Sequence, residues 1–140
     1  MRSLFCALAA VLLAWPAGQA AQPAPAAVSA WVAAPAAGAT TTSAFVEISN
    51  PTMYEIYITG ATSDAAAKVE LRAGVSGGAE PAVVPEFPVP AYGGTQAAAS
   101  APHLRLVGVT RPLAPGDTVQ LTLTTDGGAT LKVAAPVRQP

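Results

Sequence analysis

The sequence predicts an all-β protein: an antiparallel β-sandwich of seven or eight short strands with Greek-key connections. Two observations support this prediction. Apolar and polar residues alternate with a period of two in several short segments, and Gly, Pro, Asn or Asp residues separate those segments. No apolar pattern with the 3.6-residue period of a helix continues over three turns after residue 21. Short strands between regular turn signals are typical of sandwiches, including immunoglobulin-like ones.

The first 20 residues have the features of a signal peptide. Met1 and Arg2 form a short positive start, and an apolar run follows from residue 4 to residue 15. A bilayer-spanning helix needs roughly 20 apolar residues, so this run is short for a membrane span. Small residues in Gly18-Gln19-Ala20 suit signal peptidase, and we predict cleavage after Ala20 and a periplasmic protein with no membrane span. The alternative is an uncleaved anchor.

Composition predicts one domain and excludes some classes of function. Residues 21–27 are an Ala/Pro tether, 28–136 the sandwich and 137–140 a short tail. Without Arg2, six Lys and Arg residues remain against eight Asp and Glu, a net charge near −2 with no basic stripe for nucleic acid. The only cysteine, Cys6, leaves with the signal peptide, so the mature chain has no disulfide and no thiolate ligand.

The predicted strands begin with a short one at 28–32, where Trp31 is a core or edge aromatic. The strand at 43–50 places alternate apolar residues on an inward face, and Asn50-Pro51 turns the chain. A strand at 54–59 follows, and Gly60 either ends it or forms a bulge.

The second half repeats the alternation. A strand is predicted at 67–73, and the segment 74–95 is irregular because it is rich in Gly and Pro, with one short strand near 82–84. Two strands lie within 102–123, around a turn formed by Pro112-Leu113-Ala114-Pro115-Gly116-Asp117. After the turn at 126–128, the last strand covers 130–134.

The stretch 102–123 also carries a family resemblance. His103, the only histidine, is followed by Gly108, by Arg111-Pro112-Leu113 and by Gly116-Asp117-Thr118-Val119. This order resembles the end of the periplasmic copper chaperone family PCu(A)C, where a histidine and, two residues later, a methionine precede the same residues. Earlier landmarks agree: Ala30-Trp31-Val32, Asn50-Pro51, Gly60 to Ser63, Lys68 to Leu71, and Pro90 with Gly93-Gly94. The resemblance covers residues 31–136 and implies a cupredoxin-like β-sandwich.

The resemblance also implies a copper(I) site built from histidines and methionine thioethers, which suit a soft monovalent ion. In this sequence only His103 stands at such a ligand position. Arg72 is found where the first histidine is expected, Gly74 where a methionine is often found, Val83 near the distance of the next ligand, and Arg105 in place of the last methionine. A guanidinium has no lone pair for a metal.

One further candidate ligand and several plainer explanations remain. Met53, in the turn before the 54–59 strand, is the one methionine of the predicted mature chain, although a methionine there also suits packing under a loop. His103 alone matches a solvated histidine at a strand edge as well, because a lone histidine has no metal-site spacing. For Arg72 and Arg105 taken singly, the plainer explanation is a solvated surface charge.

Two functional hypotheses follow. The first is a periplasmic copper chaperone-like protein that binds copper(I) and delivers it toward cytochrome c oxidase assembly, with most metal ligands missing. Its partner is a copper-receiving periplasmic protein or another copper chaperone. The second is a copper-independent binding module that uses Arg72 and Arg105 for a protein or an anionic group. An enzyme is not expected, because the mature chain lacks a cysteine nucleophile and its one histidine has no nucleophile elbow to serve.

Overall fold

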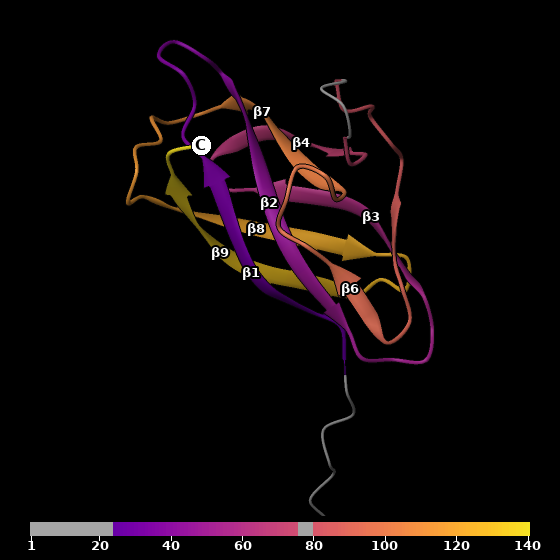
Figure 1. Ribbon diagram of the computed structural model, residues 1–140. Helices are drawn as coiled ribbons and strands as arrows, with labels where there is room; N and C mark the ends of the chain where they lie inside the picture. Colours follow the sequence, from indigo (N-terminus) through magenta and orange to yellow (C-terminus); the bar gives the residue numbers. More distant parts are fainter. Residues whose placement is uncertain (1–23, 76–79) are drawn as a thin grey trace, which may run out of the picture.

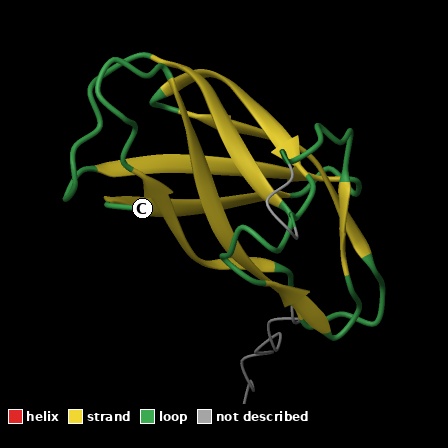
Figure 2. Cartoon of the chain, turned by 45° about the horizontal axis from the view of Figure 1, so that its top comes forward, coloured by secondary structure: helices red, strands yellow, loops and turns green. Residues whose placement is uncertain are grey.

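The computed structural model describes residues 24–75 and 80–140. The predicted signal peptide and residues 21–23 of the predicted tether lie outside these residues. The described residues form nine strands and no helix (Figure 2). The strands are β1 (Ala26–Ala33), β2 (Thr41–Asn50), β3 (Ile56–Ser63), β4 (Ala66–Arg72), β5 (Phe87–Val89), β6 (Gly93–Thr95), β7 (His103–Val109), β8 (Thr118–Thr125) and β9 (Thr130–Arg138).

The strands form two sheets that meet along one side. One sheet has the order β4-β7-β2-β1, with β6 also paired to β2, and the other has the order β9-β8-β3-β5 (Figure 1). Parallel pairing of Val32 with Val137 and of Ala33 with Arg138 joins β1 to β9. The predicted all-β sandwich is confirmed. The parallel β1–β9 pairing is the one departure from the predicted antiparallel arrangement among the described strands.

The chain alternates between the sheets, as Greek-key connections require. Strand β2 pairs with β1 and β7 in the first sheet, whereas β3 pairs with β8 and β5 in the second. The next strand, β4, returns to the first sheet beside β7. Consequently β4 and β7, which are far apart in the sequence, lie side by side and bring their outward-facing residues together.

The core lies between the sheets and consists of the inward residues of the alternating strands. Its fully buried members come from both layers, and each alternates with a more exposed neighbour along its strand, because successive side chains of a strand point to opposite faces. The largest of them are Ile48, Ile58, Leu104, Leu106, Leu121, Leu123, Val32, Val89, Val119 and Val137.

Both ends of the domain extend beyond the predicted limits. Ala26 pairs with Ser49 and Ala27 with Ile48, so these two alanines belong to β1 and not to the tether. Strand β9 continues to Arg138, so little of the predicted tail at 137–140 remains outside the sandwich. Alanine adds too little hydrophobicity for a strand end to be recognised from alternation.

The irregular segment contains more structure than predicted. The expected short strand near 82–84 is a single bridge between Val83 and Arg72, whereas β5 and β6 were not predicted. Pro88 fits within β5 because this strand lies at the end of its sheet and pairs only with β3. Of the two alternatives at Gly60, the bulge is the one present, because the β3–β8 register shifts between Ile58 and Gly60. Residues 24–75 and 80–140 contain no helix of the length and hydropathy needed to cross a bilayer.

Candidate metal centre

His103 begins β7 and is 3% exposed. Its Nδ1 lies 3.0 Å from the carbonyl oxygen of Ala101. A carbonyl oxygen can only accept a hydrogen bond, so Nδ1 carries the hydrogen in this contact. In the neutral imidazole the lone pair is then on Nε2. Fixing one ring nitrogen by a backbone carbonyl is the usual way in which proteins orient a metal-binding histidine.

Two aromatic side chains support the histidine from the neighbouring strands. The Phe45 ring on β2 lies 5.3 Å from the His103 ring, and the Trp31 ring on β1 lies 4.6 Å from that of Phe45. The Trp31 indole N–H donates to the carbonyl oxygen of Ala97 at 3.4 Å. The loop that holds Ala97 and Ala101 therefore covers a row of rings across three strands, which limits rotation of the imidazole.

Strand pairing gathers the positions that the family resemblance associates with copper. Arg72 on β4 is the direct partner of His103, and Glu70 is the partner of Arg105. Residues paired across a ladder, and residues two apart on a strand, point to the same face of a sheet. The isolated bridge places Val83 beside Arg72. His103, Arg72, Arg105 and Val83 therefore lie together on the outer face of the first sheet.

Arg72 is held by its neighbours. Its Nη1 donates to the carbonyl oxygen of Pro81 at 2.8 Å, and its Nη2 forms an ion pair with Glu70, which also contacts Lys68 at 3.5 Å. The side chains of Arg72 and Glu70 are only 14% and 17% exposed. The hydrogen bond from Arg72 is the main reason that the pKa of Glu70 is lowered.

The second arginine is more open. The Arg105 side chain is 26% exposed, and its Nη2 lies 3.9 Å from a carboxylate oxygen of Glu80, which is itself 87% exposed. Both arginines therefore face carboxylates of this chain. The anion-binding hypothesis requires two guanidinium groups that are free to bind an anion, and the structure does not provide such a pair. The Arg72 Nε is nevertheless the one buried side-chain nitrogen or oxygen without a hydrogen-bond partner in the described residues.

Two other sequence-derived positions do not join the site. Met53 is 62% exposed and follows the far end of β2. The five steps along the strand from Phe45 to Asn50 span about 17 Å at roughly 3.4 Å per residue, so His103 and Met53 are not brought together. Gly74 is close to the site, but a Cβ there would lie 2.2 Å from the carbonyl oxygen of Ser100. No side chain fits at this position without a backbone shift.

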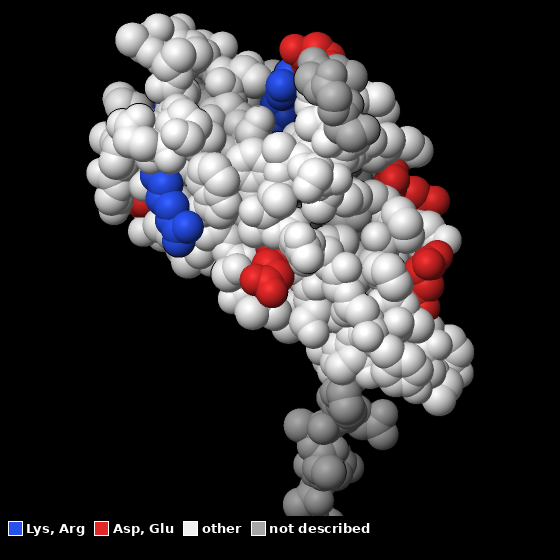
Figure 3. Space-filling model, viewed as in Figure 1, with Lys and Arg blue, Asp and Glu red and all other residues white. Residues whose placement is uncertain are grey.

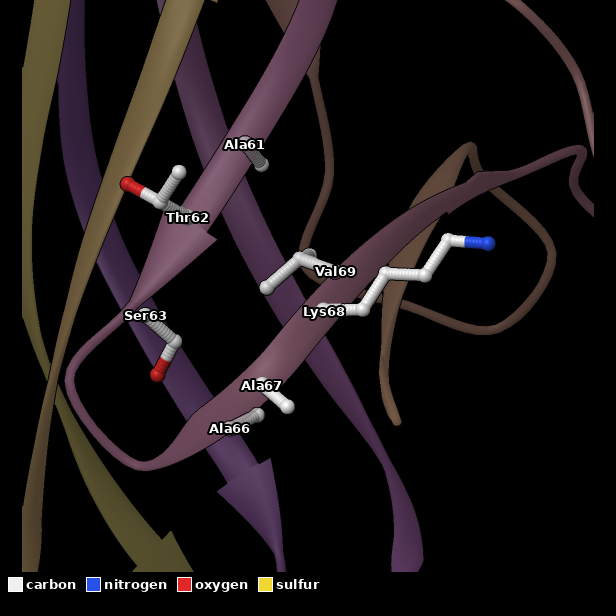
Figure 4. Close-up of a pocket in the computed structure, with 7 residues that line it drawn as sticks. All are labelled: Ala61, Thr62, Ser63, Ala66, Ala67, Lys68 and Val69. Carbon is white, nitrogen blue, oxygen red and sulfur yellow. The ribbon is translucent and has the colours of Figure 1, made fainter. Parts of the chain in front are cut away.

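The remaining surface of the described chain offers little metal chemistry. No group of three His, Cys, Asp or Glu residues is close enough to hold an ion in residues 24–75 and 80–140. A hollow of about 400 Å3 lies between β3 and β4, and Figure 4 shows the Lys68 amine extending away from it. None of its lining residues is a soft copper(I) ligand. They are Ala61, Thr62, Ser63, Ala66, Ala67, Lys68 and Val69.

Sequence reasoning missed the residues that support His103. Phe45 and Trp31 come from strands whose order in the sheet could not be read from alternation, and the Ala101 carbonyl belongs to a loop. Glu70 carried a detectable signal, because it lies two residues before Arg72 on the same face of a predicted strand and has the opposite charge.

Comparisons with known proteins identify a family and similar folds. The family model described as "Putative lipoprotein LpqE-like" matches residues 26–137. A protein of Leifsonia xyli subsp. xyli named "Putative lipoprotein Lxx21020" is 35% identical over 112 residues, which are 78% of this chain and 66% of that protein. The chain thus spans slightly less than two thirds of that relative.

Two solved structures have the same fold. The solution structure of copper(I)-bound DR1885 from Deinococcus radiodurans is 34% identical, has a TM-score of 0.69, and the match covers 85% of this chain and 82% of that one. The copper-bound PCuAC domain from PmoF2 has a TM-score of 0.69 at 18% identity, over 83% of this chain and 92% of that domain. At that identity the second likeness shows the fold alone.

Proposed function

Because the chain belongs to the LpqE-like family and has the fold of PCuAC domains, we propose that it is an exported, copper chaperone-like protein of the periplasm. Its copper(I) site is reduced to His103, so it holds its cargo weakly. Delivery toward cytochrome c oxidase assembly is the role implied by the family resemblance. The partner is then a copper-receiving periplasmic protein or another copper chaperone.

The observation that carries this proposal is the orientation of His103. The hydrogen bond from Nδ1 to Ala101 leaves Nε2 as the nitrogen with a free lone pair, as a copper(I) ligand requires. The neighbouring positions hold Arg72, Arg105 and Val83, none of which donates to a metal. Copper(I) bound by one imidazole keeps open positions, so a partner that supplies the remaining ligands takes the ion readily.

A titration of the mature periplasmic protein tests the proposal directly. Copper(I) is added anaerobically in the presence of the chromogenic chelator bicinchoninate, with a complete PCuAC domain measured in parallel. We expect the chelator to keep its copper in the presence of this protein and to lose it to the complete domain. Tight one-to-one binding by the unmodified protein would contradict the reduced site. Weak binding that does not change in the variant His103→Ala would contradict the role of His103.

The anion-binding alternative rests on one specific observation, the unpartnered Nε of Arg72. Against it, Arg72 already pairs with Glu70 and donates to Pro81, and Arg105 faces Glu80. An added carboxylate or phosphate would have to displace these carboxylates. The expected result of calorimetric titration with phosphate or citrate is therefore no measurable heat of binding, and a saturable isotherm that Arg105→Gln abolishes would restore this hypothesis.

A further inference from the structure

Three large apolar side chains are exposed together at one end of the sandwich. Met53 is 62% exposed, Tyr54 71% and Tyr92 73%. They lie on the loops that follow β2 and β5, and the Tyr92 N–H joins these loops by donating to the carbonyl oxygen of Thr52 at 3.0 Å. Exposed apolar side chains that cluster in this way mark an interaction surface more often than isolated ones do. We call Met53, Tyr54 and Tyr92 the loop patch.

A buried asparagine fixes both loops. Asn50 is completely buried, and its Nδ2 donates to the carbonyl oxygens of Tyr54 at 2.8 Å, Pro90 at 3.1 Å and Val89 at 3.2 Å. Its Oδ1 accepts from the backbone N–H of Thr52 at 3.1 Å and from the Thr52 hydroxyl at 2.6 Å. One side chain therefore ties both loops to the end of β2. The patch is rigid, which lowers the entropy cost of binding a partner.

The backbone at Tyr92 has an unusual conformation. Its φ is +53°, and it is the one residue other than glycine with a positive φ in the described chain. Glycine adopts this conformation without cost, whereas a tyrosine is strained there. Strain of this kind is concentrated at functional sites, and here it serves to project an aromatic ring into solvent.

The charged groups that act on Tyr57, beside the loop patch, are carboxylates. Glu55, Glu86 and Asp126 surround Tyr57, whose pKa is raised chiefly by the hydrogen bond from its hydroxyl to Glu55. The sequence from Ala24 to Ala67 contains no lysine or arginine. On the face shown in Figure 3, the visible basic side chains lie toward the top and the left, and acidic side chains lie along the right side.

An apolar hollow of about 440 Å3 adjoins the loop patch. It lies between the loop after β2 and the turn that joins β8 to β9, and Tyr54 forms part of its wall. A hollow beside rigid aromatic groups can receive a partner's apolar side chain, which is the usual arrangement of an energetic hot spot. Its lining includes Ala24, Pro25, Thr52, Tyr54, Ile56 and Leu131.

We propose that the loop patch and its hollow dock a segment of another protein that presents apolar side chains next to lysine or arginine. The apolar groups fill the hollow, and the cations contact the carboxylates and the exposed tyrosine rings. A second copy of this chain lacks the required charge at this end, because its own carboxylates would face those of the first copy. An anionic membrane surface attracts basic clusters, and this end has none. The proposal does not depend on copper binding.

A peptide titration followed by two-dimensional amide NMR tests this chemistry. The probe is a short synthetic peptide with leucine and arginine at alternate positions, and its control has glutamate in place of arginine. With the basic peptide we expect chemical-shift changes confined to the residues around Asn50, Tyr92 and Asp126, and these changes should weaken as salt is added. With the acidic peptide we expect none. The variant Tyr54→Ser/Tyr92→Gly should bind about tenfold more weakly.

The control variants keep the test decisive. Tyr92→Gly suits the positive φ, so this change preserves the fold. Val83→Ser removes another large apolar side chain, 60% exposed but outside the patch, and should bind the peptide as the unmodified protein does. The proposal would be overturned if the patch variant bound the basic peptide as tightly as the unmodified protein does. It would also be overturned if both peptides caused the same shift changes, or if the protein adsorbed to phosphatidylcholine vesicles and did not bind the peptide.

Discussion

Arg72 lies directly opposite His103 in the β4–β7 ladder, on the outer face of the sheet. The guanidinium stays protonated, so a permanent cation occupies the position beside the imidazole. Glu70 neutralises this cation, and the Pro81 carbonyl holds it in place. The position expected for a copper-binding histidine is therefore part of a largely buried ion pair. Copper(I) would meet a cation that the fold itself keeps in position.

The first prediction concerns the pH dependence of this ion pair. Because the pKa of Glu70 is lowered in the folded protein, chiefly by the Arg72 hydrogen bond, the pair stabilises the protein above the usual carboxyl pKa near 4.5. This stability is lost as the pH falls through the lowered value. The difference in unfolding free energy between the unmodified protein and Glu70→Gln should shrink from pH 7 to pH 3 in urea unfolding curves. A difference in unfolding free energy that does not change with pH would contradict this contribution of the ion pair.

A second prediction concerns Gly74. A Cβ at this position would meet the Ser100 carbonyl oxygen at 2.2 Å, and backbone atoms cannot rotate away as a flexible side chain does. Gly74→Ala should therefore lower the unfolding free energy by about 1–3 kcal/mol, the usual cost of forced overpacking. Gly127 has no atom within 4 Å of a built Cβ and no positive φ, so Gly127→Ala is the matched control. Equal effects of the two changes in chemical denaturation would show that the contact is unimportant.

A third prediction addresses the asparagine that fixes the loop patch. Asn50→Asp keeps the size of the side chain but replaces the donating amide with a carboxylate, which faces the carbonyl oxygens of Tyr54, Val89 and Pro90. Unfolding should become easier by about 2 kcal/mol or more, because these contacts turn repulsive. Thermal unfolding at neutral pH measures the effect. Unchanged stability would mean that the amide does not hold the loops.

The fold class could be predicted because alternation is a local property of each strand. Ala44, Val46 and Ile48 face the core as their spacing indicates, and Leu104 and Leu106 do the same on β7. Strand order is not local. Alternation alone could not indicate that Arg72 pairs with His103, because that contact depends on β4 returning to the first sheet after β3. The site positions were found by resemblance, and Phe45, which no motif marks, was not.

The short strands β5 and β6 were missed for a different reason. Pro88 lies at the middle of β5, and proline usually argues against a strand. Gly93 and Gly94 form most of β6, where a Cβ at Gly94 would lie 2.1 Å from the Ile48 carbonyl oxygen. The glycine here permits close approach of β6 to β2. From composition alone, such a glycine is interpreted as part of a turn.

The processing prediction lies outside the described residues. Gly18-Gln19-Ala20 offers small residues at the positions that signal peptidase reads, after an apolar run of the expected length. Intact-mass measurement of the protein released from the periplasm should show a chain that begins at Ala21. A mature chain that retains residues 4–15 would instead favour an uncleaved anchor.

The final prediction restores copper donors where the ladder places them. The combined change Arg72→His, Val83→Met and Arg105→Met should convert the weak site into a tight one. It adds an imidazole at position 72, directly opposite His103. It also adds thioethers at position 83, the bridge partner of residue 72, and at position 105, two residues after His103 on β7. Anaerobic bicinchoninate competition should show one-to-one binding, with at least about a hundredfold gain over the unmodified protein, because three donors replace three residues that offer none. Gly74→Met is left out because it would collide with Ser100.

A matched variant separates the placement of these donors from their mere presence. The control variant Lys68→His/Val107→Met adds the same residue types at another directly paired position of β4 and β7. Residue 68 is four residues from Arg72, and residue 107 is four residues from His103, which is about 14 Å along the ladder. This control should leave copper(I) binding weak. Adding His103→Ala to the restored variant should weaken its binding again, because the ring that Ala101 orients is lost. If the restored variant folds and binds no more copper than the matched control, then His103, Arg72, Arg105 and Val83 do not form one copper site.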